Sequence, residues 1–365
     1  MNRLTIAVVG ANGQVGSEVC LLLSLRPDVR VIPIVRSEYG ASFLRRCGLE
    51  CRIGTISDPE RATRIVRDAD LVADFSLPSG AHSRVKDAIR NNVRGAIGSA
   101  PADAAYAFIS STMAFGMATA DPAYRHRLVA RTPYSSQKRY GERLARVTGF
   151  LRGRDVYVLR LGEVHGEPQN ASRFMTDSAG LRPVALPSGG TAPSDIVFCS
   201  TIALALVNIA RRLDPPGTYT VLESPEWTLR QMYEFFARAA GRELRVLPNG
   251  ATHRQPHLGR KLLNRAFRAA TRHKDFFTAQ LLPALPMLEQ RLRGRYLAGR
   301  AAHEIGTGQA RGVSTPRHFV GPVPGRRLRT LAGIGNAMPE ETMRLREILD
   351  KALGPTGHNF RIQRT

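Results

Sequence analysis

The stretch VVGANGQVGSE, residues 8–18, decides the fold, because its glycines stand directly after an apolar run and at the start of a helical pattern. Gly10, Gly13 and Gly16 follow the spacing G-x-x-G-x-x-G. This spacing lets the chain turn tightly, approach a pyrophosphate closely and direct a helix N-terminus at its charge. A bare glycine triplet is a weak signal, but its place between a strand and a helix is the context that the motif requires. We therefore expect a dinucleotide-binding loop formed by Gly10, Asn12, Gly13, Gln14, Val15 and Gly16.

Around this loop, the first 160 residues alternate short apolar runs with helical patterns, which is typical of a parallel sheet covered by helices. Strands are expected at residues 4–9, 29–35, 71–75, 106–110 and 156–161. The predicted fold class is α/β, with a Rossmann-type doubly wound parallel sheet in residues 1–165 and a helix at about 195–212 returning to it.

The remaining part, residues 166–365, is expected to be a smaller substrate-binding domain that is basic and mainly helical. Its pattern predicts strands in GTYTVL (217–222) and LRVLP (244–248). Between them, TLRQMYEFFARAAG (228–241) is amphipathic and predicts a helix closed by Gly241.

Composition limits the function classes. The net charge is +23, and the excess is steepest after residue 250, with 21 Lys and Arg against seven Asp and Glu. Such a surface attracts anions, and Arg291, Arg293 and Arg295 are candidate pyrophosphate clamps, although a solvated helix face is the more ordinary interpretation. The arginines are dispersed and no aromatic RNA-recognition or helix-turn-helix motif is visible. We therefore expect an anionic small-molecule substrate and no nucleic acid.

The chain shows no signal-peptide pattern at its start. Its longest apolar run, residues 196–210, is shorter than the roughly 20 residues that a membrane span needs and predicts a buried helix. A cytoplasmic protein without a transmembrane segment is therefore expected. The four cysteines form no Cys-x-x-Cys pair, and Cys47 and Cys51 have no nearby histidines, so we predict reduced thiols and no metal site.

The end of the second predicted strand bears on the cofactor. An NAD enzyme usually has an acid there for the adenosine ribose, whereas an arginine accommodates a 2′-phosphate. The sequence VIPIVRS places Arg36 there with Ser37 beside it, which favours NADP, while Glu38 lies near enough to keep NAD as the alternative. Asp58 is placed to contact adenine, or else to cap a helix that begins at Pro59.

A second informative stretch is TPYSSQKRYGERL, residues 132–144. Thr132 before Pro133 is a helix start signal, which puts Tyr134 and Lys138 one turn apart on one face. A free tyrosine has a pKa of about 10, and a nearby ammonium, together with an oxidised nicotinamide, would lower it towards neutrality. A lysine suits this position because its compact ammonium can also donate to ribose hydroxyls. Only five of the 53 basic residues are lysines.

With these motifs the chain resembles an extended short-chain dehydrogenase/reductase of the NAD-dependent epimerase/dehydratase family. The resemblance covers about residues 4–247, and its motifs occur in the family's order. After the glycine loop come NNVRG with Asn92, FISSTMAFG, PYSSQKRYGE, LRLGEVHG, SDIVFCSTIALAL and GTYTVLESPEWTLRQMYEFFARAAG.

The resemblance implies a catalytic set. Counting back from Gly116, the hydroxyl that binds the substrate oxygen falls on Ser111, with Ser110 and Thr112 as neighbouring candidates. Tyr134 would be the acid/base, and Lys138 would orient the ribose and lower the tyrosine pKa. Asn92 would hold a water or a backbone group that links the lysine to solvent, or else would mark a helix bend.

Three departures from the family pattern affect the remaining contacts. DFSLPSG replaces the usual His-Leu-Ala-Ala, so Ser76 and Leu77 are expected beside the cofactor. LGEVHG places Glu163 and His165 where substrate contacts are expected, although a lone histidine is more often structural. Met113 and Ala114 stand where sugar dehydratases carry an Asp-Glu pair, which disfavours a 4,6-dehydratase.

These features predict an NAD(P)-dependent oxidoreductase or epimerase that moves a hydride at a secondary alcohol or ketone, on a nucleotide-linked sugar or a similarly anionic metabolite. The alternative is a non-catalytic NADP-sensing or scaffold protein that uses its basic surface to bind a partner or an acidic membrane. The resemblance also implies that a homodimer through a helix pair can form.

Overall fold

The computed structural model describes residues 3–78, 82–115, 133–184, 186–223, 227–247, 345, 347–349 and 351. Within these residues, seven strands form one parallel sheet in the order β3-β2-β1-β4-β5-β6-β9. The strands are β1 (Leu4–Val9), β2 (Val29–Val35), β3 (Arg52–Ile53), β4 (Leu71–Asp74), β5 (Ala105–Ser111), β6 (Val156–Leu161) and β9 (Gly217–Val221). A short parallel pair joins β7 (Glu163–His165) and β8 (Ile196–Phe198).

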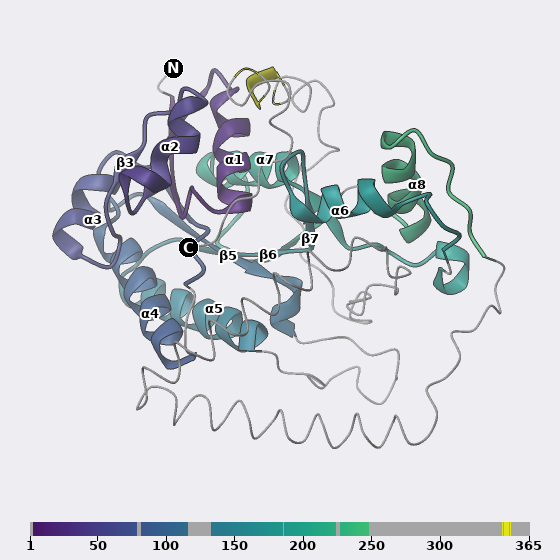
Figure 1. Ribbon diagram of the computed structural model, residues 1–365. Helices are drawn as coiled ribbons and strands as arrows, with labels where there is room; N and C mark the ends of the chain where they lie inside the picture. Colours follow the sequence, from purple (N-terminus) through teal and green to yellow (C-terminus); the bar gives the residue numbers. More distant parts are fainter. Residues whose placement is uncertain are drawn as a thin grey trace, which may run out of the picture.

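Helices cover both faces of the sheet, so the predicted α/β doubly wound class is confirmed (Figure 1). One face carries α1 (Gln14–Ser24), α2 (Glu38–Arg46) and α7 (Cys199–Ala210), and the other carries α3 (Pro59–Val66), α4 (His82–Ser99) and α5 (Pro133–Leu151). Alternate residues of β1 enter the two cores, with Ile6 and Val8 in one and Ala7 and Val9 in the other. This is the pattern of a strand that is buried on both faces.

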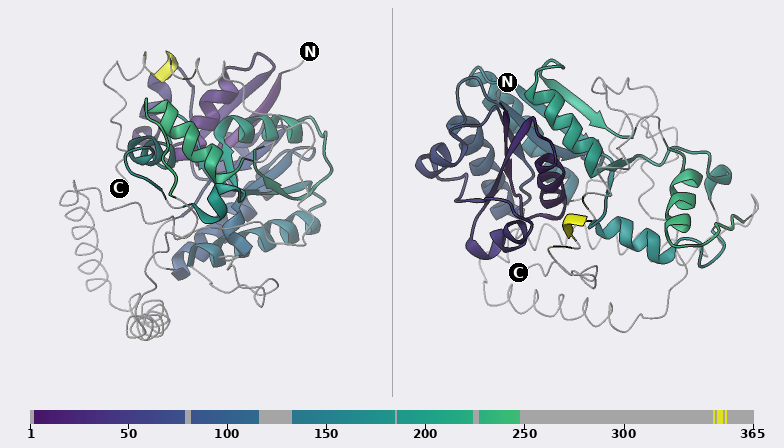
Figure 2. Two further views of the ribbon diagram at one scale, coloured as in Figure 1. Left: turned by 90° about the vertical axis from the view of Figure 1, so that its right-hand side faces the viewer. Right: turned by 90° about the horizontal axis from the view of Figure 1, so that it is seen from above.

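A third apolar cluster joins α6 (Asn170–Ser178) and α8 (Leu229–Ala239). These helices lie together on the side of the molecule away from α3 (Figures 1 and 2). Thr228 and Gln231 form a reciprocal capping box at the start of α8, and Gly241 beyond its end has a φ of 67°. Leu345 and Leu349, from the part that the sequence assigns to substrate binding, pack in the core cluster that contains α1 and α7.

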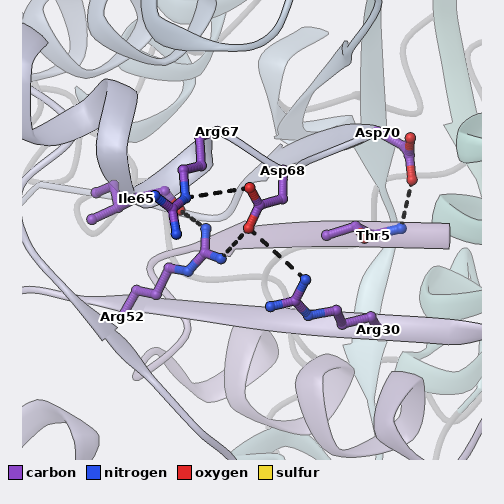
Figure 3. A network of polar contacts seen from close by, with 7 residues as sticks. All are labelled: Thr5, Arg30, Arg52, Ile65, Arg67, Asp68 and Asp70. Carbon is purple, nitrogen blue, oxygen red and sulfur yellow. Dashed lines mark hydrogen bonds and ion pairs between the residues drawn. The ribbon is translucent and has the colours of Figure 1, made fainter. Parts of the chain in front are cut away.

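The amino-terminal side of the sheet is tied by a polar network around the turn before β4 (Figure 3). The carboxylate of Asp68 lies within ion-pair distance of three arginines, at 2.6–3.8 Å, and Asp70 accepts a 2.7 Å hydrogen bond from the backbone of Thr5. The three arginines are Arg30, Arg52 and Arg67, and Arg52 also donates to the carbonyl of Ile65. Part of the arginine content is thus committed to holding strands together. This polar network lies at the amino-terminal edge of the sheet. The glycine loop lies at the opposite, carboxyl edge.

Two predicted elements are corrected by the structure. The helix expected from about residue 195 begins at Cys199, because residues 196–198 pair with residues 163–165 as β8, and Asp195 has a φ of 51° that breaks the backbone run. The strand expected at 244–248 is, over the described residues to 247, only an isolated bridge from Val246 to Val184. The bounds predicted for β1, β2 and β6 are confirmed. In the described part of the chain, no helix is long and apolar enough to cross a membrane.

Candidate active site

The glycine loop connects β1 to α1 at the carboxyl edge of the sheet, as the sequence predicts. Gly10 has a φ of 76°, and a Cβ there would lie 2.9 Å from the backbone nitrogen of Ser76. A Cβ at Gly16 would lie 2.6 Å from the carbonyl oxygen of Gly10. Gly13 stands at the N-cap position of α1, and Asn12 is exposed beside it. The loop therefore packs backbone against backbone and leaves the helix N-terminus open for a pyrophosphate.

Beyond β2, the structure separates the two residues that compete for the cofactor assignment. Arg36 is exposed at the end of the strand, and Ser37 caps α2 by accepting a 3.1 Å hydrogen bond from the backbone of Gly40. Glu38 forms an ion pair with Arg45 further along α2. The acid is thus held by its own helix, while the arginine stands exposed at the strand end.

Asp58 caps α3, accepting a 3.3 Å hydrogen bond from the backbone nitrogen of Arg61. The helix-cap alternative that the sequence left open is therefore the one seen in the structure. Leu77 is 47% exposed after β4, and Ser76 is half-buried beside Gly10. Ser76 accepts a 3.1 Å hydrogen bond from the amide of Asn92 in α4.

Ser111 and Tyr134 meet at the carboxyl end of β5, where their side chains are hydrogen-bonded. The Oγ of Ser111 also accepts a 3.2 Å bond from the backbone of Met113, so its hydroxyl proton remains available for donation. Ser110 faces the other way and donates to Glu142 at 2.6 Å. Between these two neighbours, the geometry favours Ser111. Thr112 begins the short helix η1 (Thr112–Phe115) and is half-buried.

Lys138 lies one turn after Tyr134 in α5, and its side chain is buried. Its Nζ donates a 2.7 Å hydrogen bond to the carbonyl of Ile109 and lies 5.8 Å from the centre of the Tyr134 ring. Thr132, the predicted cap of this helix, lies outside the described residues, as do Arg291, Arg293 and Arg295. The Tyr134–Lys138 spacing thus brings phenol and ammonium to one face.

Burial acts on both groups. Burial lowers the pKa of Lys138 to about 8, against the charges of Asp74 and Glu142, which raise it. Burial raises the pKa of Tyr134, and the hydrogen bond with Ser111 partly offsets that rise. The lowered tyrosine pKa that the sequence predicts depends on a bound oxidised nicotinamide as well as on Lys138. In the protein alone, desolvation of the phenolate outweighs the favourable contacts.

Two buried carboxylates next to this site are not predicted from the sequence. Glu142, one turn after Lys138, is 2% exposed and accepts two hydrogen bonds from the guanidinium of Arg160, at 2.8 and 2.6 Å. Asp74, the last residue of β4, is 1% exposed. A carboxylate at the end of an otherwise apolar strand was a visible signal for Asp74, and the i,i+4 spacing from Lys138 was one for Glu142.

A third buried carboxylate, Glu18 in α1, joins the cofactor helix to the segment before α6. It accepts hydrogen bonds from the backbone of Glu167 at 2.9 Å and from the side chain of Gln169 at 2.6 Å, and burial raises its pKa to about 7. A Cβ at Gly166 would lie 2.1 Å from its Oε1. Gln14 contacts the same segment through the carbonyl of Pro168. These contacts fix the loop start relative to α6.

The two substrate candidates after β6 differ. Glu163 is exposed in β7. His165 is fully buried, its ring centre lies 5.0 Å from that of Phe236, and its Nδ1 is 3.1 Å from the hydroxyl of Ser172. This position favours the structural interpretation of the histidine.

His165 makes a testable contribution to stability. Burial lowers its pKa to about 4, below the unfolded value, so the folded state binds fewer protons between these values. The stabilisation is complete above about pH 6.5 and is lost as pH falls towards 4, with a size of roughly 3 kcal/mol. In urea unfolding at pH 7 and 4.5, His165→Phe should lose less free energy of unfolding between the two pH values than the parent protein does. Equal losses would contradict a buried neutral imidazole.

Comparisons with known proteins bear on the family and the fold. A model of the NAD-dependent epimerase/dehydratase family matches residues 6–221. No curated protein sequence matches the chain. Similar solved structures include a UDP-N-acetylglucosamine 4-epimerase from Bacillus cereus, 16% identical over 68% of this chain and 88% of that one, with a TM-score of 0.52.

Another similar structure is a dTDP-glucose 4,6-dehydratase from Bacillus anthracis str. Ames in complex with NAD, 16% identical over 67% of this chain and 84% of that one, with a TM-score of 0.52. A UDP-N-acetylglucosamine 4-epimerase from Methanobrevibacter ruminantium M1 is 18% identical over 68% and 86% of the two chains, with a TM-score of 0.50. At these identities the likeness establishes the fold.

Proposed function

The chain belongs to the NAD-dependent epimerase/dehydratase family, of the extended short-chain dehydrogenase/reductase type, and we propose that it moves a hydride at a secondary alcohol or ketone of a nucleotide-linked sugar, with Tyr134 as the acid/base. The observation that carries this proposal is the hydrogen-bonded pair of Ser111 and Tyr134, with Lys138 one turn away at the same sheet edge as the glycine loop. The basic composition of the chain suits a substrate that carries phosphates.

The residues present fit a dinucleotide. A Cβ at Gly10 or Gly16 would collide with neighbouring backbone, so the tight loop needs glycine at both positions. Such a glycine loop is what lets a pyrophosphate approach the backbone closely. The nicotinamide, when bound, supplies or accepts the hydride. In the reductive direction Tyr134 donates its phenolic proton to the substrate oxygen, and in the oxidative direction it takes the hydroxyl proton. Ser111 donates a hydrogen bond to the same oxygen, and Lys138 donates to ribose hydroxyls.

The proposed cofactor is NADP, with NAD as the alternative, because Arg36 is exposed at the strand end and Glu38 is paired with Arg45. We expect NADPH to bind more tightly than NADH in a fluorescence titration. Arg36→Ser should weaken NADPH binding by roughly tenfold or more and leave NADH binding unchanged, since it removes a charge-assisted contact to the 2′-phosphate. Arg46→Ser, at an exposed arginine at the end of the following helix α2, is the control. Tight NADH binding with no response to NADPH would refute the assignment.

The two reaction types are separated by the fate of the nucleotide. A reductase exchanges NADPH at each turnover, whereas an epimerase retains its nucleotide and shows no net redox change. Mass analysis of any nucleotide that remains bound after purification, followed by assays with UDP- and dTDP-linked sugars, distinguishes them. A 4,6-dehydratase is disfavoured, because Met113 and Ala114 stand directly after Ser111 and Thr112 in place of an acid pair.

A further inference from the structure

Asp74 ends β4 with its carboxylate inside the protein. The Oδ1 atom accepts a 2.9 Å hydrogen bond from the backbone nitrogen of Ser76, and the Oδ2 atom accepts one of 2.9 Å from the hydroxyl of Tyr106. The residue is 1% exposed, and Tyr106 is likewise buried. A carboxylate in such a place is costly unless hydrogen bonds and a nearby cation compensate it.

The nearby cation is the ammonium of Lys138. Asp74 pairs with Phe108 of β5, and Nζ of Lys138 lies 5.6 Å from the centre of the Phe108 ring and donates to the carbonyl of the next residue, Ile109. Asp74 and Lys138 also act on each other electrostatically.

Lys138 faces a second carboxylate, Glu142 of its own helix, but that group is already bound by the guanidinium of Arg160 and the hydroxyl of Ser110. The described residues around the ammonium thus hold two cations and two carboxylates. Because the guanidinium of Arg160 neutralises the carboxylate of Glu142, the negative charge that remains to balance the ammonium of Lys138 is that of Asp74.

Asp74 is also held from the side of α4. Asn92 donates through Nδ2 to the Oγ of Ser76 at 3.1 Å, and Ser76 bonds Asp74 through its backbone nitrogen and its side chain. A polar chain therefore runs from Asn92 through Ser76 to Asp74, and so reaches the surroundings of Lys138. This contact gives Asn92 a defined partner, which the sequence could not name.

We propose that Asp74 is a positioning residue for Lys138: its buried carboxylate balances the ammonium, and Ser76 and Asn92 hold that carboxylate in place. The role in catalysis rests on the proposed function, because the ammonium matters to turnover only if Lys138 serves the cofactor and Tyr134. The effect of Asp74 on the charge of Lys138 does not rest on it, and can be measured in the protein without a substrate.

The expected pH behaviour follows from the groups that face Lys138. These are Asp74 from β4, Tyr134 and Glu142 from α5, and, behind the two carboxylates, Tyr106 from β5 and Arg160 from β6. Burial lowers the pKa of Lys138 to about 8 and Asp74 opposes that change. Burial raises the pKa of Asp74 itself, while Ser76, Tyr106 and Lys138 act against that rise. Without the charge of Asp74, Lys138 should lose its proton at a lower pH.

The experiment uses Asp74→Asn in the full chain. Asparagine removes the charge, can still accept from the backbone of Ser76 through its oxygen, and can donate through Nδ2 to the hydroxyl oxygen of Tyr106. Only five lysines occur in the sequence, so protein labelled with ¹³C-lysine gives few Cε signals, and Lys138→Met identifies the one from Lys138. We expect the titration midpoint of Lys138 to fall by about one pH unit or more in Asp74→Asn. Glu18→Gln, at another buried carboxylate, is the matched control and should leave the midpoint in place.

An unchanged Lys138 midpoint in folded Asp74→Asn would overturn the proposal, whatever happens to activity. If Asp74→Asn does not fold, the titration midpoint of Lys138 is measured in Ser76→Ala, which removes the side chain that holds the carboxylate. We expect the midpoint to fall by less in this variant. An unchanged midpoint would overturn the proposal. With active parent enzyme, the alkaline limb of the pH–rate profile should move to lower pH together with the midpoint. If Asp74→Asn shifts the Lys138 midpoint but the parent protein turns over no nucleotide sugar, the positioning role is supported. Only the proposed function is then contradicted.

Discussion

Replacing Tyr134 by phenylalanine should lower kcat by roughly 10²–10⁴-fold, because the substitution removes the acid/base and little else. Phenylalanine keeps the ring that lies 5.8 Å from Nζ of Lys138, so the packing around the lysine is retained. The lost contact is the hydrogen bond with Ser111. Steady-state rates with a nucleotide sugar measure the fall in kcat, and a fluorescence titration measures the cofactor Kd. The cofactor Kd should stay within about twofold, which is well below the tenfold change that about 1.4 kcal/mol produces.

The matched control for this variant is Tyr140→Phe, on the same helix. Tyr140 is half-buried and its ring faces Lys86, away from the pair of Ser111 and Tyr134. Its loss should leave kcat unchanged. A Tyr134→Phe enzyme as active as the Tyr140→Phe enzyme would remove the proposed acid/base, and would leave a nucleotide-binding protein of the kind that the scaffold alternative describes.

The raised pKa of Tyr134 predicts which direction of the reaction is favoured at neutral pH. A buried phenol that keeps its proton at neutral pH is suited to donate it to a ketone oxygen, whereas alcohol oxidation needs the phenolate. The upward shift therefore favours reduction at neutral pH. Because the pKa of Lys138 is about 8, its ammonium is lost before the phenolate forms as the pH rises. The predicted lowering of the Tyr134 pKa includes a bound oxidised nicotinamide, and the spacing alone does not show how strongly burial of the phenol acts against it.

Local patterns predicted the loop and six of the seven strands of the sheet, and missed the two-residue strand β3 (Arg52–Ile53). The apolar runs that became β1, β2 and β6 are bounded by polar residues or glycine, so their ends were visible. The run from residue 196 to 210 is apolar throughout most of its length, and nothing in its periodicity marks the change from β8 to α7. That boundary is set by pairing with β7, a tertiary contact.

The burial of three carboxylates was not predicted for the same reason. The strand-end position of Asp74 and the spacing of Glu142 from Lys138 were signals, but each of these carboxylates, like that of Glu18, is stabilised by partners distant in sequence. Sequence spacing placed Ser111, Tyr134 and Lys138 at one edge, but could not decide that Ser110 turns to Glu142. The core of the site was therefore predictable from motifs, and its electrostatic support was not.

Gly10→Ala should disrupt the cofactor site, because it combines backbone strain with a collision against neighbouring backbone. The φ of 76° costs an alanine about 1–2 kcal/mol. The new Cβ would also meet backbone atoms of Ser76 and Phe75 at 2.9–3.1 Å, which cannot turn aside as a flexible side chain could, and such overpacking costs typically about 1–3 kcal/mol. We expect a loss of roughly 2–5 kcal/mol in the free energy of unfolding by urea, together with cofactor binding weakened by at least about tenfold.

Gly48→Ala separates the two causes. Gly48 follows α2 with a φ of 83°, and among the described residues no atom lies within 4 Å of the point that a Cβ would occupy, so alanine there carries the backbone strain without the collision. This variant should lose only about 1–2 kcal/mol and bind the cofactor as the parent does. If Gly10→Ala lost no more stability than Gly48→Ala and bound the cofactor normally, the close contact between the glycine loop and the segment after β4 would be irrelevant to binding. The reason for placing the dinucleotide over Gly10 would then be gone, because that placement rests on a tight turn that lets a pyrophosphate approach the loop closely.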